Sequence, residues 1–389
     1  MQTANQIRGE IEALLQKAGW VIQGPETPPR PETPGVAVRD FPLARGYGTV
    51  DYLLCHMGKA VGLIEVVSEE AALKGVPVLS EKYTRGLPFS LRLFIRPLPF
   101  LYQSTGREIC FTNGFDPAPA PRGLFGFHRP ETLKQWIEDG MVGETPRDMA
   151  AEYFPEHRRR GRTFHERILI NMPPSASAGF SDGQLRVITL LEQSFQENRR
   201  RVLVVMTDEA ERTAAVIHFS GRILQFADAR RVLFVAHSDE VGQNLTQWMQ
   251  DTASRGGMAS FAKACSVEYW TDASMDPATR FCVTTLADLR HRLRLTLEDV
   301  SATDEGSAHG LRYNPDFPIE TFDVVIIDQC EKCLSDISQP ILEYFDAYLI
   351  GLSAEPNEQI AHYFEQNVVT DNAIRSRGGD GLDVITAEE

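Results

Sequence analysis

The stretch FDVVIID, residues 322–328, places four consecutive apolar residues between two aspartates. An unbroken apolar run of this length is typical of a strand in a parallel sheet that helices cover on both faces. Four more such runs stand in the second half of the chain: RVLVVM (201–206), RVLFVA (231–236), RFCVTT (280–285) and AYLIGLS (347–353). Helical stretches such as 209–225 and 238–252 separate them. The pattern predicts a doubly wound α/β domain.

Any ligand of such a domain is expected beyond the carboxyl ends of its strands, because this is where open α/β sheets bind ligands. The residues that follow the five runs are therefore the first candidates for a site. They are Asp208, His237, Leu286, Asp328 and Ala354.

The first half of the chain has a different pattern. Apolar residues at helical spacing predict a helix over residues 3–18, and the proline-rich stretch 24–35 predicts a surface connection. Four short β-type runs follow, and they pair through short turns into two hairpins: VDYLLC (50–55) with AVGLIEVV (60–67), and PLPFLYQS (97–104) with EICFTN (108–113). The first half is therefore predicted to be an α+β domain.

A polar, arginine-rich stretch, EYFPEHRRRGRTFHER (152–167), separates the two patterns. We expect one domain over residues 1–150, a basic connector over 151–170, a second domain over 171–370 and a polar tail over 371–389. The four arginines at the centre of the connector are candidates for contact with DNA phosphates: Arg158, Arg159, Arg160 and Arg162.

The composition limits the possible partners. The 389 residues include 39 Lys and Arg against 54 Asp and Glu, a formal net charge of -15. The molecule as a whole therefore repels nucleic acid and anionic lipid, and any DNA contact requires a local basic patch. No apolar run approaches the ~20 residues of a membrane span, and the N-terminal residues lack the apolar region of a signal peptide. We expect a cytoplasmic protein with no membrane contact.

The cysteine content does not favour a disulfide framework or a structural zinc site. The chain has six cysteines, of which two form a CxxC, and no second CxxC accompanies that pair. A structural zinc ion needs four ligands, and a single CxxC supplies two. The cysteines are Cys55, Cys110, Cys265, Cys282, Cys330 and Cys333.

Long segments of the chain resemble the R subunit, the motor and nuclease subunit, of type I restriction enzymes. The clearest is ILEYFDAYLIGLSAEPNEQIAHYFEQNVV (341–369), which is similar to the segment around helicase motif III. FDVVIIDQCEKC (322–333) resembles the segment around motif II, and residues 181–219 resemble the segment with an upstream glutamine and a Walker A loop. Residues 37–67 resemble the nuclease core. The resemblance implies a restriction-nuclease-like α+β domain followed by one RecA-like parallel-sheet domain.

The nucleotide motifs depart from the family pattern. Gln184 stands at the position of the adenine-contacting glutamine, but the residues aligned with the Walker A loop, Thr207 to Thr213, contain no glycine and three carboxylates. At ~5 Å and an effective dielectric constant near 20, each carboxylate–phosphate contact costs about 3 kcal/mol. This cost exceeds any gain from Arg212 and Thr213, so we expect Asp208 or Glu209 to cap a helix and ATP not to bind.

The other motor motifs change independently. Motif II keeps Asp328, which would hold magnesium through water, but its glutamate is replaced by Gln329, an amide without useful basicity. Glu331 stands in place of the histidine of motif II, and Glu355 in place of a threonine of motif III. We therefore expect a retained scaffold without ATPase activity.

The nuclease motif is only partly changed. Asp51 and Glu65 stand where the resemblance implies two carboxylates that hold Mg²⁺, but Val67 takes the position of the lysine. Of the family's downstream Gln-x-x-x-Tyr, only Tyr83 remains, since the glutamine position is Leu79. Two lysines could supply a migrated cation: Lys59, which looks too distant on its turn, and Lys82, on the following helix.

Three functions remain open at this point. The first is a catalytically silent, regulatory or binding component of a restriction-modification or defence assembly, which acts through partner subunits or duplex DNA and needs no cofactor. The second is a Mg²⁺-dependent DNA endonuclease that uses Asp51 and Glu65 and takes its motor from a partner. The third is an acidic decoy that mimics DNA.

Overall fold

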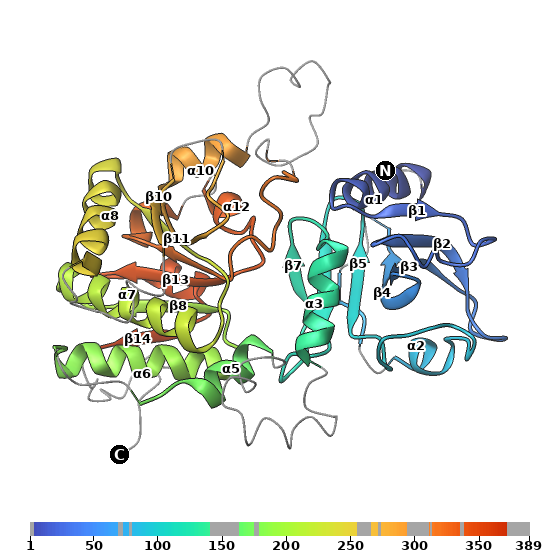
Figure 1. Ribbon diagram of the computed structural model, residues 1–389, viewed down its shortest axis with the longest axis horizontal. Helices are drawn as coiled ribbons and strands as arrows, with labels where there is room; N and C mark the ends of the chain where they lie inside the picture. Colours follow the sequence, from blue (N-terminus) through green and yellow to red (C-terminus); the bar gives the residue numbers. More distant parts are fainter. Residues whose placement is uncertain are drawn as a thin grey trace.

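The computed structural model describes residues 4–68, 73–77, 80–140, 163–174, 179–254, 266–270, 274–293, 311, 313–334 and 338–371. They form two bodies side by side, each built on its own sheet (Figure 1). The strand β7 and the helix α3 lie on the side of the first body that faces the second. No helix among the described residues is long and apolar enough to cross a membrane.

The first sheet has seven strands that follow one another in chain order. They are β1 (Val21–Gln23), β2 (Val36–Pro42), β3 (Thr49–His56), β4 (Lys59–Val66), β5 (Phe100–Ser104), β6 (Ile109–Asn113) and β7 (Arg122–Leu124). Among the described residues, the helices that accompany it are α1 (Ala4–Lys17), α2 (Glu81–Arg85) and α3 (Pro130–Gly140).

Both predicted hairpins are confirmed. The strand β3 pairs with β4, and β5 with β6, in antiparallel register. The sequence did not predict that β4 and β5 pair in parallel and join the hairpins into one mixed sheet. This pairing requires a close approach at Gly62, where an added Cβ would lie 2.3 Å from the carbonyl oxygen of Phe100.

The second sheet also has seven strands, and every neighbouring pair is parallel. The order is β10-β11-β9-β12-β13-β8-β14. The strands are β8 (Arg201–Val205), β9 (Val232–Ala236), β10 (Ser266–Tyr269), β11 (Thr279–Thr285), β12 (Val324–Ile327), β13 (Tyr348–Ser353) and β14 (Val368–Thr370). The predicted doubly wound α/β fold with a parallel sheet is confirmed.

Helices of the second body lie on both faces of this sheet (Figure 1). They are α5 (Phe164–Asn171), α6 (Asp182–Gln196), α7 (Glu209–Phe226), α8 (Asp239–Ser254), α10 (Leu286–Leu293), α11 (Cys330–Cys333), α12 (Gln339–Leu342) and α13 (Glu358–Tyr363). The helix α5 covers part of the range for which the sequence predicts a connector, and it packs against α6 and α7. The four candidate DNA-binding arginines, residues 158–160 and 162, lie outside the described residues.

The apolar runs divide between two faces, as a strand requires. In β12, Val324 and Ile326 pack into the apolar cluster beneath α6 and α7, whereas Val325 and Ile327 face a different cluster. That second cluster continues through Phe317 and Tyr313 to the side chains beneath α1 and α3. One apolar core therefore extends across the contact between the two bodies.

Candidate nuclease and nucleotide sites

The two nuclease carboxylates lie side by side on the first sheet. The register Tyr52↔Ile64 places Asp51 opposite Glu65 on adjacent strands. Asp51 accepts a hydrogen bond from the backbone N–H of Val66 through Oδ2 (2.9 Å) and one from Arg8 Nη2 through Oδ1 (3.1 Å). The guanidinium of Arg8, from α1, therefore binds a carboxylate that would hold Mg²⁺ according to the resemblance.

Glu65 has two neighbours from α2. Its Oε1 accepts a hydrogen bond from the Tyr83 hydroxyl and lies 3.7 Å from Lys82 Nζ. Burial, together with the Glu65 carboxylate, raises the pKa of Tyr83, so this hydroxyl stays protonated and remains a donor. Lys59 instead lies over the ring of Phe94 at 4.8 Å. Of the two candidate lysines, Lys82 is thus the one that lies near a nuclease carboxylate. Leu79 lies outside the described residues.

In the loop that corresponds to Walker A, the side chains of Asp208 and Arg212 form hydrogen bonds with the backbone of the loop and of α7. The loop connects β8 to α7, and Asp208 caps the helix by accepting a hydrogen bond from the N–H of Glu211 (2.9 Å), as expected. None of the residues from Met206 to Arg212 has a positive φ, the backbone conformation that a phosphate-binding loop uses. The Arg212 side chain is 2% exposed and donates from Nη1 to the carbonyl of Met206 (2.6 Å).

The remaining nucleotide residues are also engaged elsewhere. Gln184 caps its own helix: its Oε1 accepts from the N–H of Ser181 (3.0 Å), and its Nε2 donates to the carbonyl of Glu211 (3.0 Å). Thr213 lies one residue beyond Arg212 in α7 and is partly buried. Both ends of the Gln184 amide are therefore used within the protein.

The motif II segment places Asp328 and His237 together. Asp328 follows β12 and is 1% exposed, and its Oδ2 shares a hydrogen bond with Nδ1 of His237, which follows β9. Gln329 adopts a left-handed conformation (φ 44°), and its amide oxygen accepts a hydrogen bond from Lys332. Two of the five residues expected at the carboxyl edge of the sheet are thus in direct contact.

The described cysteines are buried and free of disulfides: Cys55, Cys110, Cys282, Cys330 and Cys333. Burial raises the pKa of Cys330 to about 12 and that of Cys333 to about 11. Burial therefore favours the protonated form of both thiols at neutral pH.

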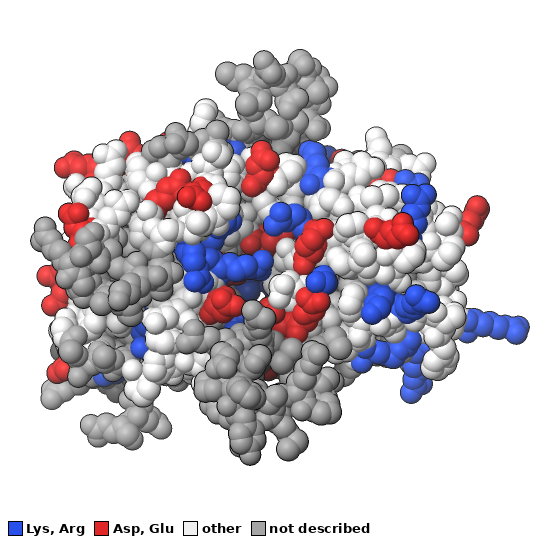
Figure 2. Space-filling model, in the orientation of Figure 1, with Lys and Arg blue, Asp and Glu red and all other residues white. Residues whose placement is uncertain are grey.

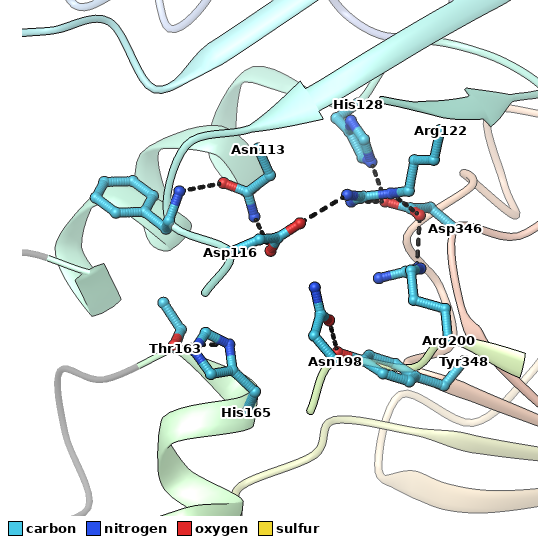
Figure 3. Close-up of polar contacts among 11 residues, drawn as sticks. Asn113, Asp116, Arg122, His128, Thr163, His165, Asn198, Arg200, Asp346 and Tyr348 are labelled. Carbon is cyan, nitrogen blue, oxygen red and sulfur yellow. Dashed lines mark hydrogen bonds and ion pairs between the residues drawn. The ribbon is translucent and has the colours of Figure 1, made fainter. Parts of the chain in front are cut away.

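A cavity of about 530 Å³ lies where the two bodies meet. At its wall, Arg122 and Arg200 point at Asp346, whose side chain is 3% exposed, and the buried His128 reaches the same carboxylate from behind the wall (Figure 3). Arg122 binds both Asp346 oxygens (2.9 Å each), and Arg200 binds Oδ1 (2.7 Å). Sequence reasoning missed this cluster, because Asp346 and Arg122 are 224 positions apart and no pattern in the sequence pairs them.

The charges around this cavity nearly balance. Among the described residues that line it are five arginines and six carboxylates. On the face drawn in Figure 2, blue and red side chains alternate around the hollow between the bodies. The cavity therefore offers little net attraction for phosphate. Two further arginines of the second body also have partners: Arg201 pairs with Glu343 (2.8 Å), and Arg292 lies over the ring of Trp270.

Comparisons with known proteins agree with the resemblance drawn from the motifs. Residues 178–358 match the family described as type III restriction enzyme, res subunit. The chain is 21% identical over 432 aligned residues to the endonuclease subunit of the type I restriction enzyme EcoKI from Escherichia coli (strain K12). That alignment covers 92% of this chain and 33% of the relative, so the chain spans about a third of the relative's length.

A solved structure also resembles the chain, namely a fragment assigned to the HsdR subunit of a type I restriction enzyme from Vibrio vulnificus YJ016. The sequence identity is 18%, with 96% of this chain and 59% of that chain covered and a TM-score of 0.30. The alignment to the EcoKI subunit shows that the chain resembles the endonuclease subunit of a type I restriction enzyme in sequence along most of its length.

Proposed function

We propose that this R-subunit-like chain is a catalytically silent component of a restriction or defence assembly, where it binds partner subunits or duplex DNA. The observation that carries the proposal is the closed nucleotide loop. Arg212, the cation at the position that would face phosphate, is buried and donates to Met206. To reach a nucleotide it would have to give up this hydrogen bond, and three carboxylates would still repel the phosphates.

The contact between the two bodies further supports a binding role. A continuous apolar core and the buried Asp346 cluster join them. Breaking a buried ion pair of this kind costs several kcal/mol, so the two bodies are expected to move together. A rigid two-body unit is suited to presenting fixed surfaces to partners.

Calorimetry with Mg²⁺ and ATP tests the loss of the motor. We expect no binding tighter than a Kd of about 0.1 mM, which corresponds to about 5 kcal/mol. A full-length motor subunit with an intact Walker A loop serves as the positive control. A Kd below 0.1 mM for this chain would show that the loop opens and would contradict the proposal.

A metal-dependent endonuclease is the second candidate, and one contact favours it. Lys82 lies 3.7 Å from Glu65, so the site retains two carboxylates and a lysine, although the lysine comes from α2. Such a cation stabilises the charge that develops on the phosphate during cleavage. Against this candidate stands Arg8, which already pairs with Asp51.

Plasmid nicking in Mg²⁺ or Mn²⁺ separates the two candidates. We expect no cleavage by the native chain. The informative variants are Glu65→Ala and Lys82→Ala, and Lys59→Ala is the matched control because Lys59 lies over Phe94 rather than near Glu65. Nicking that both informative variants abolish and the control retains would establish the endonuclease.

The decoy remains the third proposal, and it depends on the net charge of -15 alone. The mixed charges on the face in Figure 2 give it no particular support. Failure to bind duplex DNA at low salt, together with competition against DNA for a partner, would favour it over DNA binding.

A further inference from the structure

Three possible metal ligands converge at the carboxyl edge of the second sheet. Glu209 is the first residue of α7, which follows β8, while His237 follows β9 and Asp328 follows β12. One ligand atom from each residue can be chosen so that all three lie within 4.8 Å of one another. The fold thus brings together side chains that are separated by up to 119 positions.

The burial of Asp328 and its unpaired carboxylate oxygen are a second observation that indicates a cation site. The residue is 1% exposed, and its Oδ1 has no hydrogen-bond partner in the described part of the chain. Among the described residues, its one ion-pair partner is His237. A buried carboxylate oxygen without a partner destabilises the folded protein, because it loses its hydrogen bonds to water and no protein donor or cation replaces them.

We propose that Glu209, His237 and Asp328 bind one divalent transition-metal ion, Zn²⁺ above all, which the protein holds without a nucleotide. This inference goes beyond the proposed function. It concerns the edge of the sheet that the closed loop leaves without phosphates, and the ion would join the ends of β9 and β12 to the start of α7.

The chemical types of the three ligands indicate which metal ion the site prefers. One imidazole nitrogen and two carboxylates favour Zn²⁺ over Mg²⁺, since Mg²⁺ prefers oxygen ligands in octahedral geometry. Three protein ligands leave one tetrahedral position for water.

The required movement is small. Bonds of about 2.1 Å in a tetrahedron place neighbouring ligand atoms about 3.4 Å apart. His237 and Asp328 are already in hydrogen-bond contact, so the ion would replace the proton that they share. Glu209 is exposed and can rotate inward without disturbing the core.

The test is calorimetric titration of Zn²⁺ into the full chain after treatment with EDTA. We expect one ion per chain with a Kd below about 10 μM, and a rise in melting temperature on binding. His237→Ala and Asp328→Asn should each weaken binding by at least about tenfold. Glu209→Gln, a change on the surface that leaves the core intact, should weaken it in the same direction.

His291→Ala is the matched control, because His291 is an exposed histidine on α10 and should leave the affinity unchanged. Co²⁺ supplies a second readout: histidine and carboxylate ligation gives no thiolate charge-transfer band, whereas binding to cysteine does. If a core variant fails to fold, Glu209→Gln and the Co²⁺ spectrum still decide.

A Kd above about 100 μM for the native chain would overturn the inference. So would a Zn²⁺ affinity equal to that of the native chain in all three ligand variants. A thiolate charge-transfer band with Co²⁺ would also overturn it. None of these results bears on the ATP titration, so a failed metal site leaves the proposed function standing. Conversely, tight ATP binding would contradict the proposal that the chain is catalytically silent, but it would not show whether Zn²⁺ binds.

Discussion

Replacing Asp346 by asparagine removes the negative charge that holds the two bodies together. The native carboxylate accepts hydrogen bonds from Arg122 Nε and Nη2 (2.9 Å each) and Arg200 Nη2 (2.7 Å), and its Oδ2 lies 2.9 Å from His128 Nε2. An asparagine at this position is nearly the same size but neutral. Its amide would keep one acceptor oxygen and turn an NH₂ group toward donors.

The expected loss in the free energy of unfolding is about 3 kcal/mol. Removal of one partner from a buried ion pair costs about 3–5 kcal/mol, because the remaining charge stays buried without compensation. Arg122 also pairs with Asp116 (3.1 Å), and Arg200 also lies over the ring of Tyr348. These remaining contacts place the expected loss near the lower end of that range.

The loss should depend on pH. Burial opposes ionisation of Asp346, but Arg122 and Arg200 outweigh it and hold the pKa of this carboxyl well below its usual value. A carboxylate with a depressed pKa stabilises the folded state above the pKa of the unfolded chain, and this contribution is lost as the pH falls through the folded pKa. The native chain and the variant should therefore differ fully near pH 7 and converge in strong acid.

Urea titrations at several pH values measure this difference, with tryptophan fluorescence and far-ultraviolet circular dichroism as two probes. Asp316→Asn is the control, because Asp316 is an exposed aspartate outside the contact. A loss below about 1 kcal/mol at pH 7, or one equal to that of the control, would refute the argument that this cluster joins the two bodies.

Three further predictions concern separate features. Asp208→Ala removes the cap of α7 and should lower the free energy of unfolding by about 1 kcal/mol in thermal melts; no change would mean that the cap is dispensable. Burial, assisted by the positive charge of Arg222, lowers the pKa of His218 to about 4, so the chain should lose stability from about pH 6.5 toward pH 4, and His218→Gln should reduce that loss in urea titrations. Fluorescence anisotropy should detect weak, salt-sensitive and sequence-independent binding of duplex DNA, and the binding should fall when four arginines are changed to alanine; unchanged binding would place the contact elsewhere. The four are Arg158, Arg159, Arg160 and Arg162.

The sequence alone determined the elements that have a strong local pattern. Unbroken apolar runs predicted β8, β9, β11, β12 and β13, because a strand covered on both faces must be apolar at every position. The glycine-free loop likewise predicted that Asp208 or Glu209 caps a helix. Helix capping involves residues close together in the sequence, so the sequence pattern is enough to predict it. The three-residue strands β1, β7 and β14 were missed because they are too short to show a pattern.

The tertiary structure alone decided which distant side chains meet. The resemblance to the nuclease core identified Asp51 and Glu65, but the contact of Lys82 with Glu65 depends on where α2 packs. The pairing of His237 with Asp328 depends on β9 lying beside β12. Asp346 carries no local signal at all, because its charge is neutralised by arginines that reach it only after both sheets have formed and packed together.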